Sequence, residues 1–268
     1  MVADVEASSS LQKQRHNQNL AQIKTLQSAK NKKVMMKENN NAAYRGKTKI
    51  EKIYTRDKIE LNLATHNINE LKSNNQKVEV LYAWALDNSI DILELAEMNI
   101  TAKEGNFLTK SWNEYKNFWA SADPNKKKGS GVGLLIGKQW EKHLGQIDRI
   151  SEYMITANFM FKQAEILVVM VYIPPNNKIE RSIIQKALVE KYIKRSSRTQ
   201  MIIMGDLNCI VDADLDRLQK SKQKPKKQDP LIRWLSRQEL QDAYRVINPN
   251  ERKFSWLGRE QETRIDYI

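Results

Sequence analysis

A carboxylate and an amide follow a short apolar segment in the second half of the chain. Asp206 and Asn208 lie two residues apart, after Gly205 and the apolar run 201–204. Because side chains alternate along an extended chain, both can point the same way from a strand end. The carboxylate can position a water or bind a hard cation, and the amide can donate to a phosphoryl oxygen. A turn that only ends a strand is the alternative, since Gly, Asp and Asn favour turns.

Three more polar residues lie at the ends of segments that read as strands. Glu97 follows the apolar segment that begins at Ile90, and hard cations such as Mg²⁺ take carboxylate oxygens as ligands. Asn67 lies just past the first strand, where its amide can orient carboxylates or reach a phosphate. Tyr172 lies near the end of the long apolar run 166–173, and its hydroxyl can donate to an anionic oxygen. Taken singly, the alternatives are a surface glutamate, a turn asparagine and a packed ring.

The last residues, Thr263 to Ile268, read as a strand with Arg264 and Asp266 on alternate positions. The alternative there is an ordinary edge strand with a surface arginine and aspartate.

Strands in series with helices between them are expected to position these residues. Two alternating or apolar segments flank a helical pattern early in the chain, and several strands and two helices follow. We expect an α+β fold, a layered sandwich in which two sheets pack face to face with helices outside. The strands are predicted at 59–65, 90–93, 131–136, 153–160, 166–173 and 201–204, and the helices at 78–86, 179–192 and 231–240.

Charge and polarity divide the 268 residues into a tail and one domain. The formal net charge is +13, and residues 1–58 hold 13 basic and 5 acidic residues, so the excess is concentrated there. We expect residues 1–57 to form a basic, mostly disordered extension and residues 58–268 to form a single domain. A basic chain favours partners that carry phosphate, although a merely soluble basic protein is the alternative.

Cysteine content and hydropathy limit the class of protein further. Cys209 is the single cysteine, so an intrachain disulfide or a cysteine-based zinc site is excluded, and metal chemistry must use oxygen ligands. No apolar run approaches the ~20 residues of a membrane span, and the N-terminus lacks the apolar stretch of a signal peptide. We expect an intracellular protein with no membrane association and no disulfide-linked partner.

Six short segments, in this order, resemble those of the endonuclease/exonuclease/phosphatase superfamily. Within it the chain is most similar to the apurinic/apyrimidinic-type endonuclease domain of non-LTR retrotransposons, over about residues 59–268. The segments are Leu63–Asn69, Leu95–Glu97, Gly131–Ile136, Val171–Pro174, Gly205–Asn208 and Arg264–Tyr267.

The resemblance implies a DNase I-like fold, a four-layered α/β sandwich, and hydrolysis of DNA phosphodiesters with Mg²⁺ or Mn²⁺ in the nucleus. It implies that Glu97 binds the metal with Asn67 beside it, and that Tyr172 lies near the scissile phosphate. It also implies that Asp206 activates the water and Asn208 contacts the phosphate. Asp266 matches an aspartate that orients a catalytic histidine.

Two departures from the family pattern shape the expectation about activity. Ala96 stands where a glutamine often precedes the glutamate. The family's last strand carries Ser-Asp-His or a similar motif, whereas this sequence stops at Ile268, and its histidines are His16, His66 and His143. We therefore expect a C-terminally truncated domain that lacks its last strand, with catalytic competence as an open question.

Two lysine-rich segments are the predicted nucleic-acid contacts. They are Lys126, Lys127 and Lys128, and a later loop containing Lys222, Lys224, Lys226 and Lys227. Two alternatives to an active endonuclease remain. One is a catalytically dead fragment that binds nucleic acid, and the other is a phosphatase acting on inositol or lipid phosphates.

Overall fold

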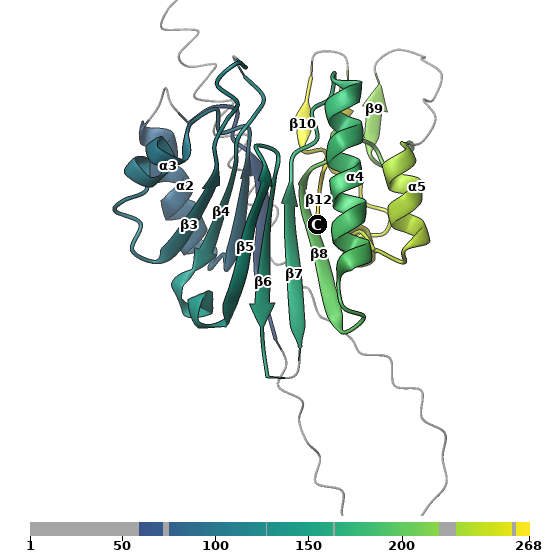
Figure 1. The fold of residues 1–268 in the computed structure, drawn as a ribbon. Coiled ribbons are helices and arrows are strands. Elements are labelled where there is room, and N and C mark those ends of the chain that lie inside the picture. The colour runs from purple at the N-terminus through teal and green to yellow at the C-terminus, as the bar shows by residue number, and fades with distance from the viewer. Residues whose placement is uncertain (1–58, 72–74, 127, 163, 220–228, 259–260) are drawn as a thin grey trace, which may run out of the picture.

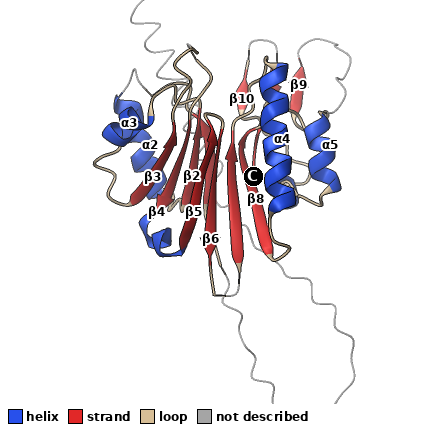
Figure 2. Ribbon diagram, viewed as in Figure 1, coloured by secondary structure: helices blue, strands red, loops and turns tan. Residues whose placement is uncertain are grey.

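A computed structural model describes residues 59–268 except 72–74, 127, 163, 220–228 and 259–260 (Figure 1). The predicted disordered extension, residues 1–57, lies outside the described residues. Two β-sheets pack against each other, with helices on their outer faces (Figure 2). The arrangement confirms the predicted four-layered α+β sandwich.

The first sheet has the strand order β1-β2-β4-β3. Strands β1 (Leu63–Asn67) and β2 (Ile92–Ala96) are parallel, because α2 (Asn75–Asp87) makes the crossover between them. Strands β4 (Val132–Gly137) and β3 (Tyr115–Ala120) then add antiparallel. Every residue of β2 and β4 is buried, as the apolar composition of a central strand covered on both faces requires. The short helix α3 (Ala102–Leu108) begins with a capping box formed by Thr101 and Glu104.

The second sheet has the strand order β12-β8-β7-β6-β5. Strands β5 (Leu144–Ser151), β6 (Met154–Met160) and β7 (Glu165–Val171) form an antiparallel meander. Helix α4 (Lys178–Lys194) then returns the chain, so β8 (Thr199–Asp206) pairs parallel to β7. Strand β12 (Asp266–Tyr267) pairs antiparallel with the end of β8.

The remaining elements are short. They are a 3-10 turn at Lys138–His143, a small sheet of β9 (Arg217–Gln219), β10 (Trp256–Leu257) and β11 (Gln261–Thr263), and helices α5 (Pro230–Arg237) and α6 (Ala243–Ile247).

Two apolar clusters hold the layers together. The larger lies between the sheets and includes Leu134, Met154 and Val169. The smaller lies between the first sheet and its helices and includes Leu93, Trp84 and Trp119. Burial of these side chains is the main driving force for folding. Among the described residues, no helix combines the length and apolar character needed to cross a membrane.

Several predicted boundaries were wrong. The first strand was predicted at 59–65 but runs from Leu63 to Asn67, because pairing with β2, and not local alternation, fixes its register. The C-terminal strand was predicted as continuous from Thr263 to Ile268. It is two strands, β11 and β12, which belong to different sheets, and Arg264 lies between them. Strand β5 was missed because its exposed residues hide the pattern, and β3 and the short helices α3 and α6 were also missed.

Gly205 allows β7 and β8 to approach each other closely just before the end of β8. Its φ is +139°, and a Cβ atom built there would lie 2.0 Å from the carbonyl oxygen of Val171. The clash would be with backbone, which cannot rotate away as a side chain can. Any other residue type must therefore push apart two paired strands.

We expect Gly205→Ala to lower the free energy of unfolding by about 2–4 kcal/mol, because it combines steric overlap with an unfavourable φ. Urea denaturation followed by tryptophan fluorescence measures the change. Gly145→Ala is the matched control, since a Cβ at Gly145 would meet its nearest neighbour at 3.3 Å and the φ there is not positive. Equal stability of the two variants would contradict the role assigned to Gly205.

Candidate active site

Four strands from the two sheets end at the same edge of the sandwich. Asn67 ends β1, and Asp206 ends β8. Glu97 directly follows β2, and Tyr172 directly follows β7. Because β1 and β2 are parallel, as are β7 and β8, each pair ends together, and β1 and β2 both contact β8 where the two sheets pack. The structure therefore gathers four predicted site residues at one edge.

The Asn67 side chain joins the two sheets at this edge. Its Nδ2 donates to Glu97 Oε1 at 2.8 Å and to Asp206 Oδ2 at 3.0 Å. Its Oδ1 accepts from the backbone N–H of Asn69 at 3.1 Å, which fixes the orientation of the amide. One amide thus holds two carboxylates that come from different sheets.

Glu97 reaches this position through an unusual backbone conformation. Its φ is +54°, in the left-handed region that non-glycine residues seldom occupy. The carbonyl of Glu97 accepts from the backbone of Glu70 at 2.8 Å and from Asn99 Nδ2 at 2.9 Å. The Tyr172 hydroxyl hydrogen-bonds the Glu97 carboxylate. Burial, together with this negative charge, raises the pKa of Tyr172, so the hydroxyl remains a donor.

Asp206 is buried and receives a hydrogen bond on each carboxyl oxygen. Oδ2 accepts from Asn67, and Oδ1 accepts from the backbone N–H of Asn208 at 2.9 Å. Asn208, with a φ of +46°, is half-buried beside it. Burial and the nearby charge of Asp266 raise the pKa of Asp206 well above its ordinary value, although the bonds from Asn67 and Asn208 oppose the shift. A cation at this edge would favour the ionised form.

Asp266 lies directly opposite Asp206, because the two are register partners in the antiparallel pair of β12 and β8. Burial raises the pKa of Asp266 to about 6, while a hydrogen bond from Ser255 and the charge of Arg264 oppose the shift. One oxygen, Oδ1, is buried without a hydrogen-bond partner among the described residues. The predicted residues Asp206 and Asp266 are thus brought together, and Asp266 has an unused acceptor.

Glu94 is a further carboxyl near this site, and the sequence analysis did not single it out. It lies within β2 and is fully buried. Its Oε2 accepts from the hydroxyl of Thr65, its register partner on β1. The available signal was a glutamate inside the apolar run Ile92–Ala96, where a charge has no ordinary place.

Comparison with known proteins gives no sequence relative. No protein-family model matches the chain, and no curated protein sequence does either. Many solved structures match by fold, and three of them share 17–19% sequence identity with this chain. The AP endonuclease of Archaeoglobus fulgidus has a TM-score of 0.57, covering 78% of this chain and 85% of that one. The Leishmania major AP endonuclease LMAP has a TM-score of 0.59 over 76% of each chain. The Neisseria 3′ phosphatase NExo, bound to a product DNA hairpin, has a TM-score of 0.57, covering 78% and 85%.

The chain has the DNase I-like fold. The fold predicted from six short segments is therefore confirmed by structures that share it. The chain also spans 66% and 63% of two D. rerio TDP2 structures, at a TM-score of 0.45.

The donor set at the edge of this DNase I-like domain fits a hard divalent cation. Glu97 offers a partly exposed carboxylate, and Asp206 adds a second carboxylate that the Asn67 amide nitrogen links to it. In the part of the chain that the structure describes, no group of three or more His, Cys, Asp and Glu side chains is arranged to hold a metal. Mg²⁺ commonly uses one or two carboxylates and completes its shell with waters and phosphate oxygens. The residues present therefore fit Mg²⁺ or Mn²⁺ better than a metal that needs a full protein cage.

The lysines predicted to contact nucleic acid have mixed outcomes in this DNase I-like domain. Lys126 Nζ contacts Glu180 and the Tyr153 hydroxyl, and lies within 4.0 Å of Asp123 and Glu152, so its charge is already offset. Lys128 is exposed and lies 3.7 Å from Glu70. The others lie outside the described residues: Lys127, Lys222, Lys224, Lys226 and Lys227.

Arg264 is buried, so the alternative of a surface arginine is wrong. Its Nε and Nη2 donate to the two oxygens of Asp216 at 2.9 and 3.1 Å, and Nη1 donates to Asp242 at 3.2 Å. Arg245 also binds Asp216. This cluster of two arginines and two aspartates, which we call the Arg264 cluster, joins the loop after β8 to α6 and β12. It is structural, because its charges satisfy one another.

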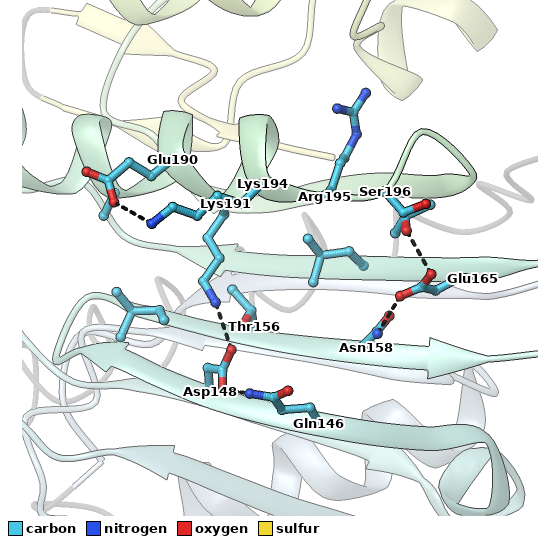
Figure 3. Close-up of a pocket in the computed structure, with 14 residues that line it drawn as sticks. Gln146, Asp148, Thr156, Asn158, Glu165, Glu190, Lys191, Lys194, Arg195 and Ser196 are labelled. Carbon is cyan, nitrogen blue, oxygen red and sulfur yellow. Dashed lines mark hydrogen bonds and ion pairs between the residues drawn. The ribbon is translucent and has the colours of Figure 1, made fainter.

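A polar groove of about 430 Å³ lies between α4 and the outer faces of β5, β6 and β7 (Figure 3). Its charged groups are held by neighbours: Lys191 pairs with Asp148 at 2.7 Å, and Glu165 accepts from Asn158 and Thr199 at 2.6 and 2.8 Å. It shares no lining residue with the site at the strand ends.

Proposed function

We propose that this chain is a metal-dependent phosphodiesterase of the retroelement endonuclease type, which cleaves DNA in the nucleus. The observation that carries the proposal is the pair of carboxylates, Glu97 and Asp206, that the Asn67 amide holds at one edge of two sheets. The ordered resemblance to retrotransposon endonuclease domains supports the substrate and the location. The net charge of +13 supports a phosphate-rich partner.

The residues divide the work of hydrolysis between them. A divalent ion held by Glu97, with Asn67 beside it, would neutralise charge that develops on the phosphoryl oxygens. Asp206, held by two donors, aligns a water for attack and accepts its proton. The Tyr172 hydroxyl and the Asn208 amide donate to non-bridging oxygens of the phosphate. Asp266 lies opposite Asp206 on the paired strand β12.

The names of the fold neighbours are consistent with this substrate class. Two of them are AP endonucleases, and the third is a 3′ phosphatase solved with a DNA product. At identities of 17–19% these structures support only the fold of this chain. The proposed substrate class is argued from the residues of the site.

We expect the purified chain to nick supercoiled plasmid with Mg²⁺ and to lose this activity when EDTA removes the metal. Glu97→Gln should lower the rate at least ~10²-fold, since it removes the ligand charge while keeping an acceptor for Asn67. Glu79→Gln is the matched control, because Glu79 is exposed on α2. Titration calorimetry with Mg²⁺ should show binding weakened by Glu97→Gln alone.

Four substrates separate the proposed function from its alternatives: intact plasmid, an abasic-site duplex, a 3′-phosphate oligonucleotide and soluble inositol phosphates. Turnover of inositol phosphates in preference to DNA would overturn the choice of substrate. DNA binding that weakens steeply with salt, without any cleavage, would instead identify a nucleic-acid-binding protein. Nicking that persists equally in Glu97→Gln would remove the assigned site.

A further inference from the structure

Glu94 is the most unusual side chain in the core of the domain. It is fully buried within β2, between Leu93 and Leu95, and strand β2 is covered on both faces. Its Oε2 accepts from the Thr65 hydroxyl, but Oε1 is buried with no hydrogen-bond partner among the described residues. No cation in that part of the chain pairs with it. An ionised carboxylate in such a place costs several kcal/mol, as an order of magnitude.

The groups that face Glu94 favour its protonated form. Burial raises the pKa of Glu94 well above its ordinary value, and the negative charges of Asp266 and Asp206 raise it further. The Thr65 hydroxyl and the His66 backbone oppose the shift without cancelling it. Burial without a cationic partner therefore favours the protonated form of Glu94, which has one O–H to donate.

The acceptor available to this O–H is a nearby carboxyl oxygen that lacks a donor among the described residues. Both oxygens of Asp206 are occupied, one by Asn208 and the other by Asn67. Asp266 has a bond from Ser255, and its Oδ1 is buried without a partner. Among the described residues, the region of the site thus holds two orphan carboxyl oxygens, Glu94 Oε1 and Asp266 Oδ1.

We propose that Glu94 is a positioning residue of the active site, which donates a hydrogen bond from Oε1 to Asp266 Oδ1. The bond would hold the β12 carboxylate in place from the opposite sheet. Glu94 touches neither the water nor the phosphate, and it acts through Asp266. This inference rests on the proposed function for its catalytic part.

Two substitutions at Glu94 test whether its hydrogen-bond donor, and not its charge or its volume, is what matters. Glu94→Gln keeps a donor and the shape, so we expect kcat for plasmid nicking within about threefold of wild type. Glu94→Leu keeps the volume without a donor. We expect kcat about 10- to 100-fold lower, as for loss of other orienting partners, with KM for DNA unchanged. The Tm of Glu94→Leu should be equal or higher, because an apolar residue replaces a buried polar group.

Opposite changes in Tm and kcat would exclude a merely structural role. Wild-type kcat in Glu94→Leu would overturn the proposal, and so would equal losses in the Gln and Leu variants, which would indicate an ionised glutamate. Infrared spectroscopy adds a readout that needs no activity. The difference spectrum of wild type minus Glu94→Gln at pH 7 should contain the C=O stretch of a protonated carboxylic acid, because any contribution from Asp206 is common to both proteins and cancels. If the wild type does not nick DNA, the proposed function fails, while this band still tests Glu94. Absence of the band from this difference spectrum would overturn the protonated state.

Discussion

Replacing Asp206 with asparagine is expected to lower kcat for DNA nicking by about 10²- to 10⁴-fold, the range for loss of a general base. Asparagine keeps the shape, and its Oδ1 still accepts from Asn67 or from the Asn208 backbone. The change removes the negative charge that aligns and deprotonates water. Steady-state nicking of plasmid with saturating Mg²⁺ measures the effect.

Binding and stability should respond to Asp206→Asn in a different way. The charge of Asp266 raises the pKa of Asp206, so removing one of the two charges should leave the Tm equal or higher. DNA affinity, measured by fluorescence anisotropy, should be equal or tighter, because a negative charge near the phosphate is lost. Asp214→Asn is the matched control, since Asp214 is exposed in the loop after β8. Nicking by Asp206→Asn within threefold of this control would contradict the assigned role.

The largest loss of stability is expected from breaking the Arg264 cluster. Asp216→Asn should lower the free energy of unfolding by about 3–5 kcal/mol, because it leaves two guanidinium groups without their shared counter-ion. Arg264 is only 4% exposed and Asp216 is fully buried, so water cannot replace the lost contacts. Urea denaturation at pH 7, followed by circular dichroism, measures the difference.

A surface pair and a pH series serve as controls for Asp216→Asn. Glu190→Gln breaks the exposed pair with Lys194 and should cost less than about 1 kcal/mol. Burial alone would raise the pKa of Asp216, but the hydrogen bonds and charge of Arg264 lower it overall. Its ionisation therefore stabilises the fold above the unfolded pKa, and this contribution is lost as pH falls through the lower folded pKa. The gap between wild type and variant should narrow in acid, and a constant gap would argue against the ion pair.

Much of the site was predictable because its residues lie where strands end. Apolar runs in the sequence predicted approximately where β2, β7 and β8 end. The polar residue near the end of each run was a candidate site residue: Glu97, Tyr172 and Asp206. The structure brings Glu97 and Asp206 together, as the ordered resemblance implied. The DNase I-like fold followed from the same segments. Local sequence could not predict the hydrogen bonds that link Glu97 and Asp206 through the Asn67 amide. Asn67 is 30 residues from Glu97 and 139 residues from Asp206 in the sequence.

Three features that the sequence analysis missed or misjudged depend on packing between distant elements: Glu94, the burial of Arg264 and strand β5. Glu94 resembles any strand glutamate until both faces of β2 are seen to be covered. Arg264 lies between two strands of different sheets, and its partner Asp216 is 48 residues away. The exposed strand β5 lacks an apolar pattern, because pairing with β6, more than its own burial, holds it. The environments of Glu94, Arg264 and β5 are determined by burial and long-range pairing, which a single sequence does not show.

The amide of Asn67 makes assembly of the whole fold a condition for chemistry. One carboxylate that it holds belongs to the first sheet and the other to the second, so neither half of the sandwich contains a complete site. A nascent or partly opened chain with only one sheet formed would lack the complete site. Under the proposed function, hydrolysis would therefore require that both sheets have formed and packed together.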